Sequence, residues 1–171
     1  PAVGSAPFWL YFPEQRDPKS PWHDRRVRLA TNLALDLKTI NDALTLGHSR
    51  LTGSICPENF EFYWQPPAPV YDPGRARKLL AEAGHARGFD AGDYYCDASY
   101  ANIGEVVLNN LREVGIQVKL RPLERAAFFK AYSEKKLKNL IQGGSGAFGN
   151  AATRLEAFAV KGGAYVYGSY P

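Results

Sequence analysis

Two periods of apolar residues alternate along the chain, and they predict strands and helices in turn. Apolar runs or strict alternation predict strands within residues 8–12, 94–96, 116–120 and 137–142. Apolar spacings of three and four residues predict helices over residues 24–46, 72–84, 103–114, 124–133 and 151–160. Strands that alternate with helices indicate βαβ units. We therefore expect an α/β fold with a mostly parallel or mixed sheet, flanked by helices on both faces.

Residues 48–72 interrupt this alternation. Four prolines stand among large aromatic side chains in this stretch, which reads as an irregular surface segment held by its aromatics. A helix start follows directly, because Asp72 suits an N-cap, Pro73 suits the first helical position and Gly84 suits the end. With 171 residues, 45% of them hydrophobic, we expect residues 1–171 to form a single domain.

The net charge of +4 and the pI near 9.1 raise the possibility of a small basic nucleic-acid-binding domain. The basic clusters are thin, however. Arg25, Arg26 and Arg28 lie on a predicted helix, and three lysines of residues 135–138 flank a helix end, where cations favour the helix dipole. Solvated surfaces explain both clusters better, so nucleic acid is not an expected partner. The alternative predicts an affinity that falls steeply with salt.

The cysteines and histidines give little support for a metal site or a catalytic nucleophile. Cys56 and Cys96 form no CxxC pair, and they could be bridged or free, with free thiols favoured. His23, His48 and His85 lie on separate segments without ligand spacing, which argues against a metal site. No nucleophile motif is present either, so we expect neither an enzyme nor a cofactor.

A Gly-rich turn offers one contrasting interpretation. Gly144-Ser-Gly-Ala-Phe-Gly149 matches the G-x-G-x-x-G pattern between a predicted strand and a predicted helix. A dinucleotide-binding unit should continue to a second strand that ends in an acidic residue about twenty positions on. The sequence lacks that continuation, so turn formation is favoured and a nucleotide-binding enzyme domain that uses Gly144–Gly149 is the less favoured alternative.

Ligands of open α/β sheets bind beyond the carboxyl ends of parallel strands. Three stretches follow predicted strand ends, at residues 97–102, 122–125 and 143–150. Together they present an aromatic and polar mixture suited to a small organic ligand: Tyr100, Arg125, Ser145, Phe148 and Asn150. For three of them a structural role is as plausible, with Phe148 in the core, Asn150 as a helix cap and Arg125 simply solvated.

Three ordered motifs resemble one known family. Ser20-Pro-Trp-His-Asp-Arg-Arg-Val-Arg28, Tyr71-Asp-Pro-Gly-Arg-Ala-Arg-Lys-Leu-Leu-Ala-Glu-Ala-Gly84 and Leu111-Arg-Glu-Val-Gly-Ile-Gln-Val118 are similar to segments of peptide-type (family 5) solute-binding proteins of ABC importers. The resemblance implies a periplasmic receptor with a type II periplasmic-binding-protein fold, which closes two lobes on a solute and delivers it to membrane permease subunits. Under this reading residues 1–171 are the truncated second lobe, the other lobe is missing, and a signal peptide lies upstream.

The sequence departs from the family at two ligand positions. Dipeptide-binding members carry an Asp after the strand that matches residues 137–142, where it pairs with the α-amino group, but the turn here reads Gly144-Ser-Gly-Ala147. A buried ammonium without a carboxylate is costly. Arg125 stands where the family has an aromatic residue, and a cation suits a carboxylate, a phosphate or sugar hydroxyls. We expect an anionic or polyhydroxylated ligand, or a peptide bound mainly through its backbone.

Overall fold

The structure, a computed structural model, describes residues 7–144 and 150–167. Its centre is a four-stranded sheet with the strand order β1-β4-β2-β3. The strands are β1 (Phe8–Tyr11), β2 (Phe89–Asp97), β3 (Ile116–Leu123) and β4 (Leu140–Gly144). Strand β2 runs parallel to β3 and β4, whereas β1 runs antiparallel to β4. The predicted α/β fold with a mixed sheet is confirmed.

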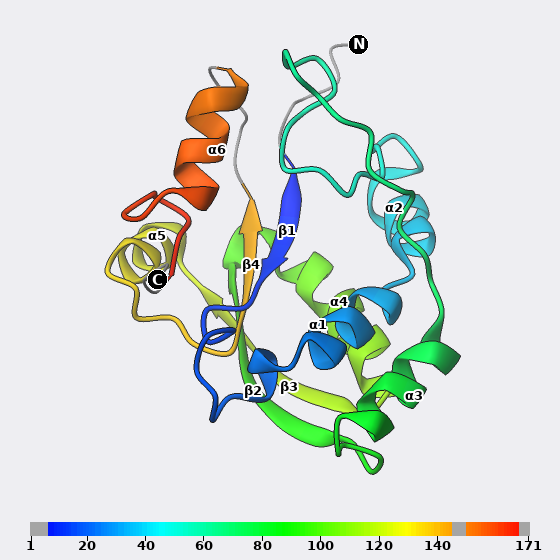
Figure 1. The fold of residues 1–171 in the computed structure, drawn as a ribbon. Coiled ribbons are helices and arrows are strands. Elements are labelled where there is room, and N and C mark those ends of the chain that lie inside the picture. Colours follow the sequence, from blue (N-terminus) through cyan, green and yellow to red (C-terminus); the bar gives the residue numbers. More distant parts are fainter. Residues whose placement is uncertain (1–6, 145–149, 168–171) are drawn as a thin grey trace.

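Helices cover both faces of the sheet (Figure 1), with α5 and α6 on the side opposite to α1, α3 and α4. The α-helices are α1 (Arg25–Leu33), α2 (Leu37–Thr45), α3 (Pro73–Glu82), α4 (Ala101–Glu113), α5 (Arg125–Ser133) and α6 (Ala151–Ala159). Two short 3-10 helices, η1 (Pro21–His23) and η2 (Ala98–Tyr100), precede α1 and α4. Residues 46–72, all described, contain neither helix nor strand.

Strand β2 divides the hydrophobic core because its side chains alternate between the two faces. Tyr94 and Cys96 belong to the larger core, together with Trp22 and apolar residues of α1, α3 and α4. Tyr95 packs against the smaller core on the α5 side, whose buried members are Phe128, Tyr132, Leu137, Ile141 and Tyr167. The chain therefore buries its central strand on both faces, as strands of α/β proteins do.

The helix predicted over residues 24–46 is in fact two helices. Helix α1 ends at Leu33, and Asp36 begins α2 by accepting a hydrogen bond from the Thr39 N–H at 3.0 Å. The backbone N–H of Asp36 in turn donates to the Asn110 side chain on α4 at 3.0 Å. A new N-cap anchored to another helix overrides the continuous apolar spacing.

The last strand lies further along the chain than the predicted range of 137–142. It begins at Leu140, because Asn139 has a left-handed backbone with φ of 60°. Leu137 packs in the smaller core outside the strand. At the other end, Gly143 and Gly144 extend the strand by pairing with Trp9 and Phe8 of β1. Glycines that read as turn residues are therefore strand residues here.

The topology gathers several strand ends at one edge of the sheet, which we call the carboxyl edge. It comprises the carboxyl ends of β2, β3 and β4, at Asp97, Leu123 and Gly144, and the amino end of β1, where Phe8 lies opposite Gly144. The chain reaches β3 from β2 through α4 and reaches β4 from β3 through α5, on the opposite face. Strands β3 and β4 thus flank β2, the arrangement in which open α/β sheets leave a ligand crevice.

Both cysteines are free, as the sequence favours. The Cys96 side chain is fully buried in the larger core, whereas Cys56 is half-buried. Burial, and next the negative charge of Asp97, raise the pKa of the Cys96 thiol to about 11. Because the thiolate is the reactive species, the two thiols should differ sharply in reactivity.

We predict that a chromogenic disulfide reagent at pH 8 labels Cys56 rapidly in the native chain and labels Cys96 at least about a hundredfold more slowly. In denaturant both thiols should react at the same rate. Stopped-flow absorbance measures the two phases, and Cys56→Ser should remove only the fast one. Two fast phases in the native chain would contradict the buried position of Cys96.

The close pairing of β1 with β4 predicts a second effect. A Cβ added to Gly143 would lie 2.4 Å from the Trp9 indole, so Gly143→Ala should lower the free energy of unfolding by about 1–3 kcal/mol. Gly74→Ala on α3 is the matched control, because the nearest atom to its added Cβ is the Asp72 carboxylate at 3.5 Å. Urea denaturation measures the free energy of unfolding of both variants. Equal stability of Gly143→Ala and Gly74→Ala would contradict the packing of Trp9 on Gly143.

Candidate functional site

An ion pair between a strand end and a helix start forms the polar centre of the carboxyl edge. The Nη1 of Arg125, the first residue of α5, donates to Oδ2 of Asp97 at 2.7 Å. The other carboxylate oxygen of Asp97 accepts from the Ser99 N–H at 3.0 Å. The Asp97 side chain is only 6% exposed, whereas that of Arg125 is 58% exposed. A buried carboxylate therefore holds a cation that remains accessible to solvent.

Neighbouring groups fix the Arg125 side chain further. Glu124 caps α5 by accepting from the Ala126 N–H at 2.9 Å, which sets the direction of the first helical turn. One turn along, the Phe129 ring lies beneath the guanidinium, with 5.1 Å from Cζ to the ring centroid. Within the described residues, one guanidinium N–H group is used on Asp97, so other donors remain for a ligand carboxylate or hydroxyl.

Tyr100 lies at the same edge and contacts the first strand. Its ring packs edge-on against Phe8 with 4.9 Å between centroids, and both rings are partly exposed, at 38% and 44%. The Tyr100 carbonyl accepts from Nε2 of Gln142 at 3.3 Å. Gln142 is itself buried and accepts at Oε1 from the Tyr94 hydroxyl at 2.9 Å. A core polar network thus positions an aromatic pair that faces solvent.

Asn150 has a defined structural role as the N-cap of α6. Its side chain accepts from the Thr153 N–H at 3.0 Å, and the Thr153 hydroxyl accepts from the Asn150 N–H at 3.2 Å. These reciprocal bonds form a capping box. Of the other expected site residues, Ser145 and Phe148 lie outside the described residues, as does most of the Gly144–Gly149 turn.

Sequence reasoning placed residues 97–102 at this edge but assigned no role to Asp97, and it missed Phe8 altogether. The predicted strand stopped at Cys96, so Asp97 was the first residue of a loop stretch with no assigned role. An acidic residue directly after a buried apolar strand was the available signal. Phe8 gave no signal, because its place beside Tyr100 depends on the antiparallel pairing of β1 with β4.

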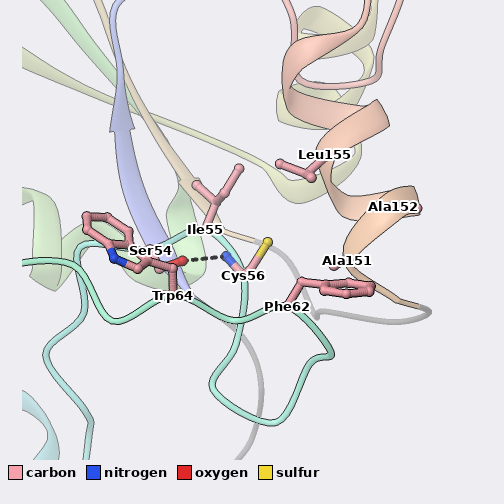
Figure 2. Close-up of a pocket in the computed structure, with 8 residues that line it drawn as sticks. All are labelled: Ser54, Ile55, Cys56, Phe62, Trp64, Ala151, Ala152 and Leu155. Atoms are coloured by element: carbon pink, nitrogen blue, oxygen red, sulfur yellow. Dashed lines mark hydrogen bonds between the residues drawn. The ribbon is translucent and has the colours of Figure 1, made fainter.

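A hollow of about 400 Å³ lies between residues 46–72 and α6 (Figure 2), and we call it the α6 hollow. Its lining is mostly apolar and consists of Ser54, Ile55, Cys56, Phe62, Trp64, Ala151, Ala152 and Leu155. The Cys56 N–H donates to the Ser54 Oγ at 3.1 Å and closes a local turn. Across the interface, Nε of Arg154 on α6 donates to the Ile55 carbonyl at 2.8 Å.

No group of three or more His, Cys, Asp or Glu side chains within residues 7–144 and 150–167 is arranged to hold a metal ion. Among the same residues no helix combines the length and apolar character that crossing a membrane requires.

Comparison with known proteins places the chain in a family. Residues 3–165 match the model of bacterial extracellular solute-binding proteins, family 5 Middle. The chain is 31% identical over 144 residues to the Haemophilus influenzae protein named heme-binding protein A, an alignment that covers 77% of this chain and 25% of that protein.

Solved structures share the fold. DppA from Helicobacter pylori, in complex with the peptide STSA, matches 96% of this chain and 34% of its own with a TM-score of 0.78 and 22% identity. AgaA from A. tumefaciens R10, in complex with agropinic acid, matches 91% of this chain and 32% of its own with a TM-score of 0.76 and 23% identity. These likenesses confirm the type II periplasmic-binding-protein fold. This chain spans about a third of the length of each of the two solved relatives.

The family match also confirms the location that the sequence predicts. Its members are extracellular solute-binding proteins, in agreement with the expected periplasmic, extracytoplasmic location. As a family they are solute-binding transport proteins of ABC importers. The family model covers residues 3–165, and the family's fold recurs in the solved relatives. The chain therefore belongs to the family 5 bacterial extracellular solute-binding proteins.

Proposed function

We propose that the chain forms one lobe of the substrate-binding component of an ABC importer. In this proposal the carboxyl edge is one wall of an interlobe cleft, and the other lobe of the full-length protein supplies the opposite wall. The closed receptor delivers its solute to permease subunits in the membrane. The proposed wall includes Tyr100, Arg125 and Asn150, and from the sequence alone we assign Ser145 and Phe148 to it as well.

The observation that carries the proposal is the Asp97–Arg125 pair. The Asp97 carboxylate is almost fully buried, and its partner Arg125 is exposed at the sheet edge where ligands of such folds bind. A guanidinium already held by a carboxylate and by the Phe129 ring loses little rotational freedom when it binds a ligand. The arrangement fits a receptor for a polar solute.

The same pair narrows the class of solute. Arg125 supplies N–H donors, which suit a carboxylate, a phosphate or sugar hydroxyls. We infer an anionic or polyhydroxylated solute, or a peptide bound mainly through its backbone carbonyls. Relatives are found with different ligands, a peptide in DppA and agropinic acid in AgaA, so family membership alone leaves the class open.

Several basic side chains already bind protein groups, which argues against the nucleic-acid-binding alternative. Arg26 pairs with Asp24 at 2.6 Å, and Arg28 donates to the carbonyls of Trp22 and His23 at 2.7 and 2.8 Å. Lys135 donates to the Ala164 carbonyl at 2.8 Å. Side chains committed to protein partners make poor contacts to a phosphate backbone, because a new contact would first have to break these bonds.

We predict that native mass spectrometry of the full-length protein, as purified, detects a retained polar solute. Arg125→Ala should weaken its affinity by about tenfold to a hundredfold, the effect of losing a hydrogen bond to a charged group. Asp97→Asn should weaken it less, because the guanidinium stays but loses its buried anchor. Isothermal titration with the identified solute measures each change.

Arg121→Ala is the matched control for these variants. Arg121 lies on β3 and also pairs with an aspartate, Asp93 at 2.8 Å, and its side chain is 54% exposed. Its loss removes the same charge without touching the proposed wall. Unchanged affinity in Arg125→Ala, or an equal loss in Arg121→Ala, would contradict the role of Arg125.

A further inference from the structure

The α6 hollow has the size and lining of a small-molecule site. Its volume of about 400 Å³ falls within the range of ligand pockets in proteins. None of the eight residues that line it carries a formal charge, and aromatic or aliphatic side chains dominate. A charged group placed there would lose hydration without an opposite charge to pair with, so the lining selects an uncharged apolar occupant.

Two large aromatic side chains remain in solvent at this hollow (Figure 2). Phe62 is 86% exposed and Trp64 is 69% exposed. Rings left this exposed contribute little hydrophobic stabilisation to the folded chain. Phe62 also has a left-handed backbone with φ of 62°, within a turn in which the Tyr63 N–H donates to the Phe60 carbonyl at 3.1 Å. A bulky residue in this conformation is strained, and such strain is concentrated at functional sites.

Contacts of Arg154 hold the α6 side of the hollow in place. Arg154 of α6 is buried, and its Nε donates to the Ile55 carbonyl at 2.8 Å. Its guanidinium lies over the Phe158 ring at 4.8 Å and over the Trp9 ring at 5.6 Å. These contacts tie residue 55 to both α6 and β1. A wall held in place before binding reduces the ordering cost that a ligand must overcome.

The hollow also lies at the end of the sheet that carries the proposed ligand wall (Figure 1). Helix α6 begins at Ala151, on the connection that leaves the carboxyl end of β4, and Ala151 and Ala152 line the hollow. Figure 1 shows the start of α6 at the same end of the sheet as the end of β4 and the start of β1. A solute that spans both places has to extend from the carboxyl edge past the end of β4.

We propose that the α6 hollow is a subsite for an uncharged apolar group of the solute. This inference rests on the proposed function and narrows its ligand class: the solute is amphipathic, with a polar or anionic part at Arg125 and an apolar part between α6 and the rings of Phe62 and Trp64. The apolar part contributes affinity by leaving water, and the polar part orients it.

The probe for the test is N-phenyl-1-naphthylamine, an uncharged planar fluorophore whose emission rises in apolar surroundings. Titrated into the intact chain, it should bind saturably with one molecule per chain. Ala152→Phe fills the hollow from an exposed helical position and should raise the probe's dissociation constant at least about tenfold. Leu155→Ser, which removes apolar lining, should act in the same direction.

Val70→Ser is the matched control, since Val70 is 61% exposed on the same irregular segment but does not line the hollow. It should leave probe affinity unchanged, and unfolding midpoints show that all variants fold. Non-saturable binding of the probe would overturn the inference, as would a probe affinity of Ala152→Phe within twofold of the parent. A probe affinity that falls as the chain dimerises would also overturn it, since a second copy would then cover the hollow. Failure of the proposed function shows separately, as no effect of Arg125→Ala on solute affinity.

Discussion

The buried hydrogen bond from the Tyr94 hydroxyl to Oε1 of Gln142 holds the carboxyl edge together. It joins β2 to β4 at 2.9 Å, and the same Gln142 amide reaches the Tyr100 carbonyl at 3.3 Å. Both side chains are buried, so loss of either partner leaves a polar group without water, at a cost of about 1–3 kcal/mol. Burial also raises the pKa of Tyr94 well above its usual value, so the hydroxyl stays a donor.

This network requires α4 to approach the sheet closely. A Cβ on Gly104 would lie 2.7 Å from the end of the Leu120 side chain and 3.2 Å from the Tyr94 ring, so a larger residue here would force Leu120 to shift. The Tyr100 carbonyl and the Asp97 carboxylate lie on the 3-10 turn that leads from β2 into the same helix. Packing in the core thus determines where the polar groups of the edge stand.

The Asp97–Arg125 pair is better understood as a positioning device than as a source of stability. A buried carboxylate loses hydration that its partner returns only in part, so such pairs contribute little net folding energy. What the pair provides is a cation in a fixed place. Arg125 stays exposed to solvent, as its proposed contact with a solute requires, and the neighbouring Phe129 ring restricts its side chain further.

Sequence patterns predicted most of the fold and part of the site. The Asp72-Pro73 start, the helical spacing of α4 and the alternation of β3 are local signals, and the structure bears them out. The break at residues 34–36 was missed because the Asp36 cap depends on Asn110, which is distant in sequence. Arg125 was found from its place after a strand.

The pairing of Arg125 with Asp97 and the contact of Tyr100 with Phe8 were not predictable, because both depend on how separate strands align. The α6 hollow escaped prediction for the same reason. It needs the irregular segment to fold back on a helix about ninety residues later, and no local rule sets such a contact.

The central claim is that the carboxyl edge of this sheet is a solute-binding wall. A crystal structure of the full-length protein with its retained solute tests it most directly. We expect a polar solute atom within about 3 Å of the Arg125 guanidinium, the distance of a hydrogen bond. A solute bound only at the opposite edge of the sheet, where Gly88 meets Gly115, would contradict the account.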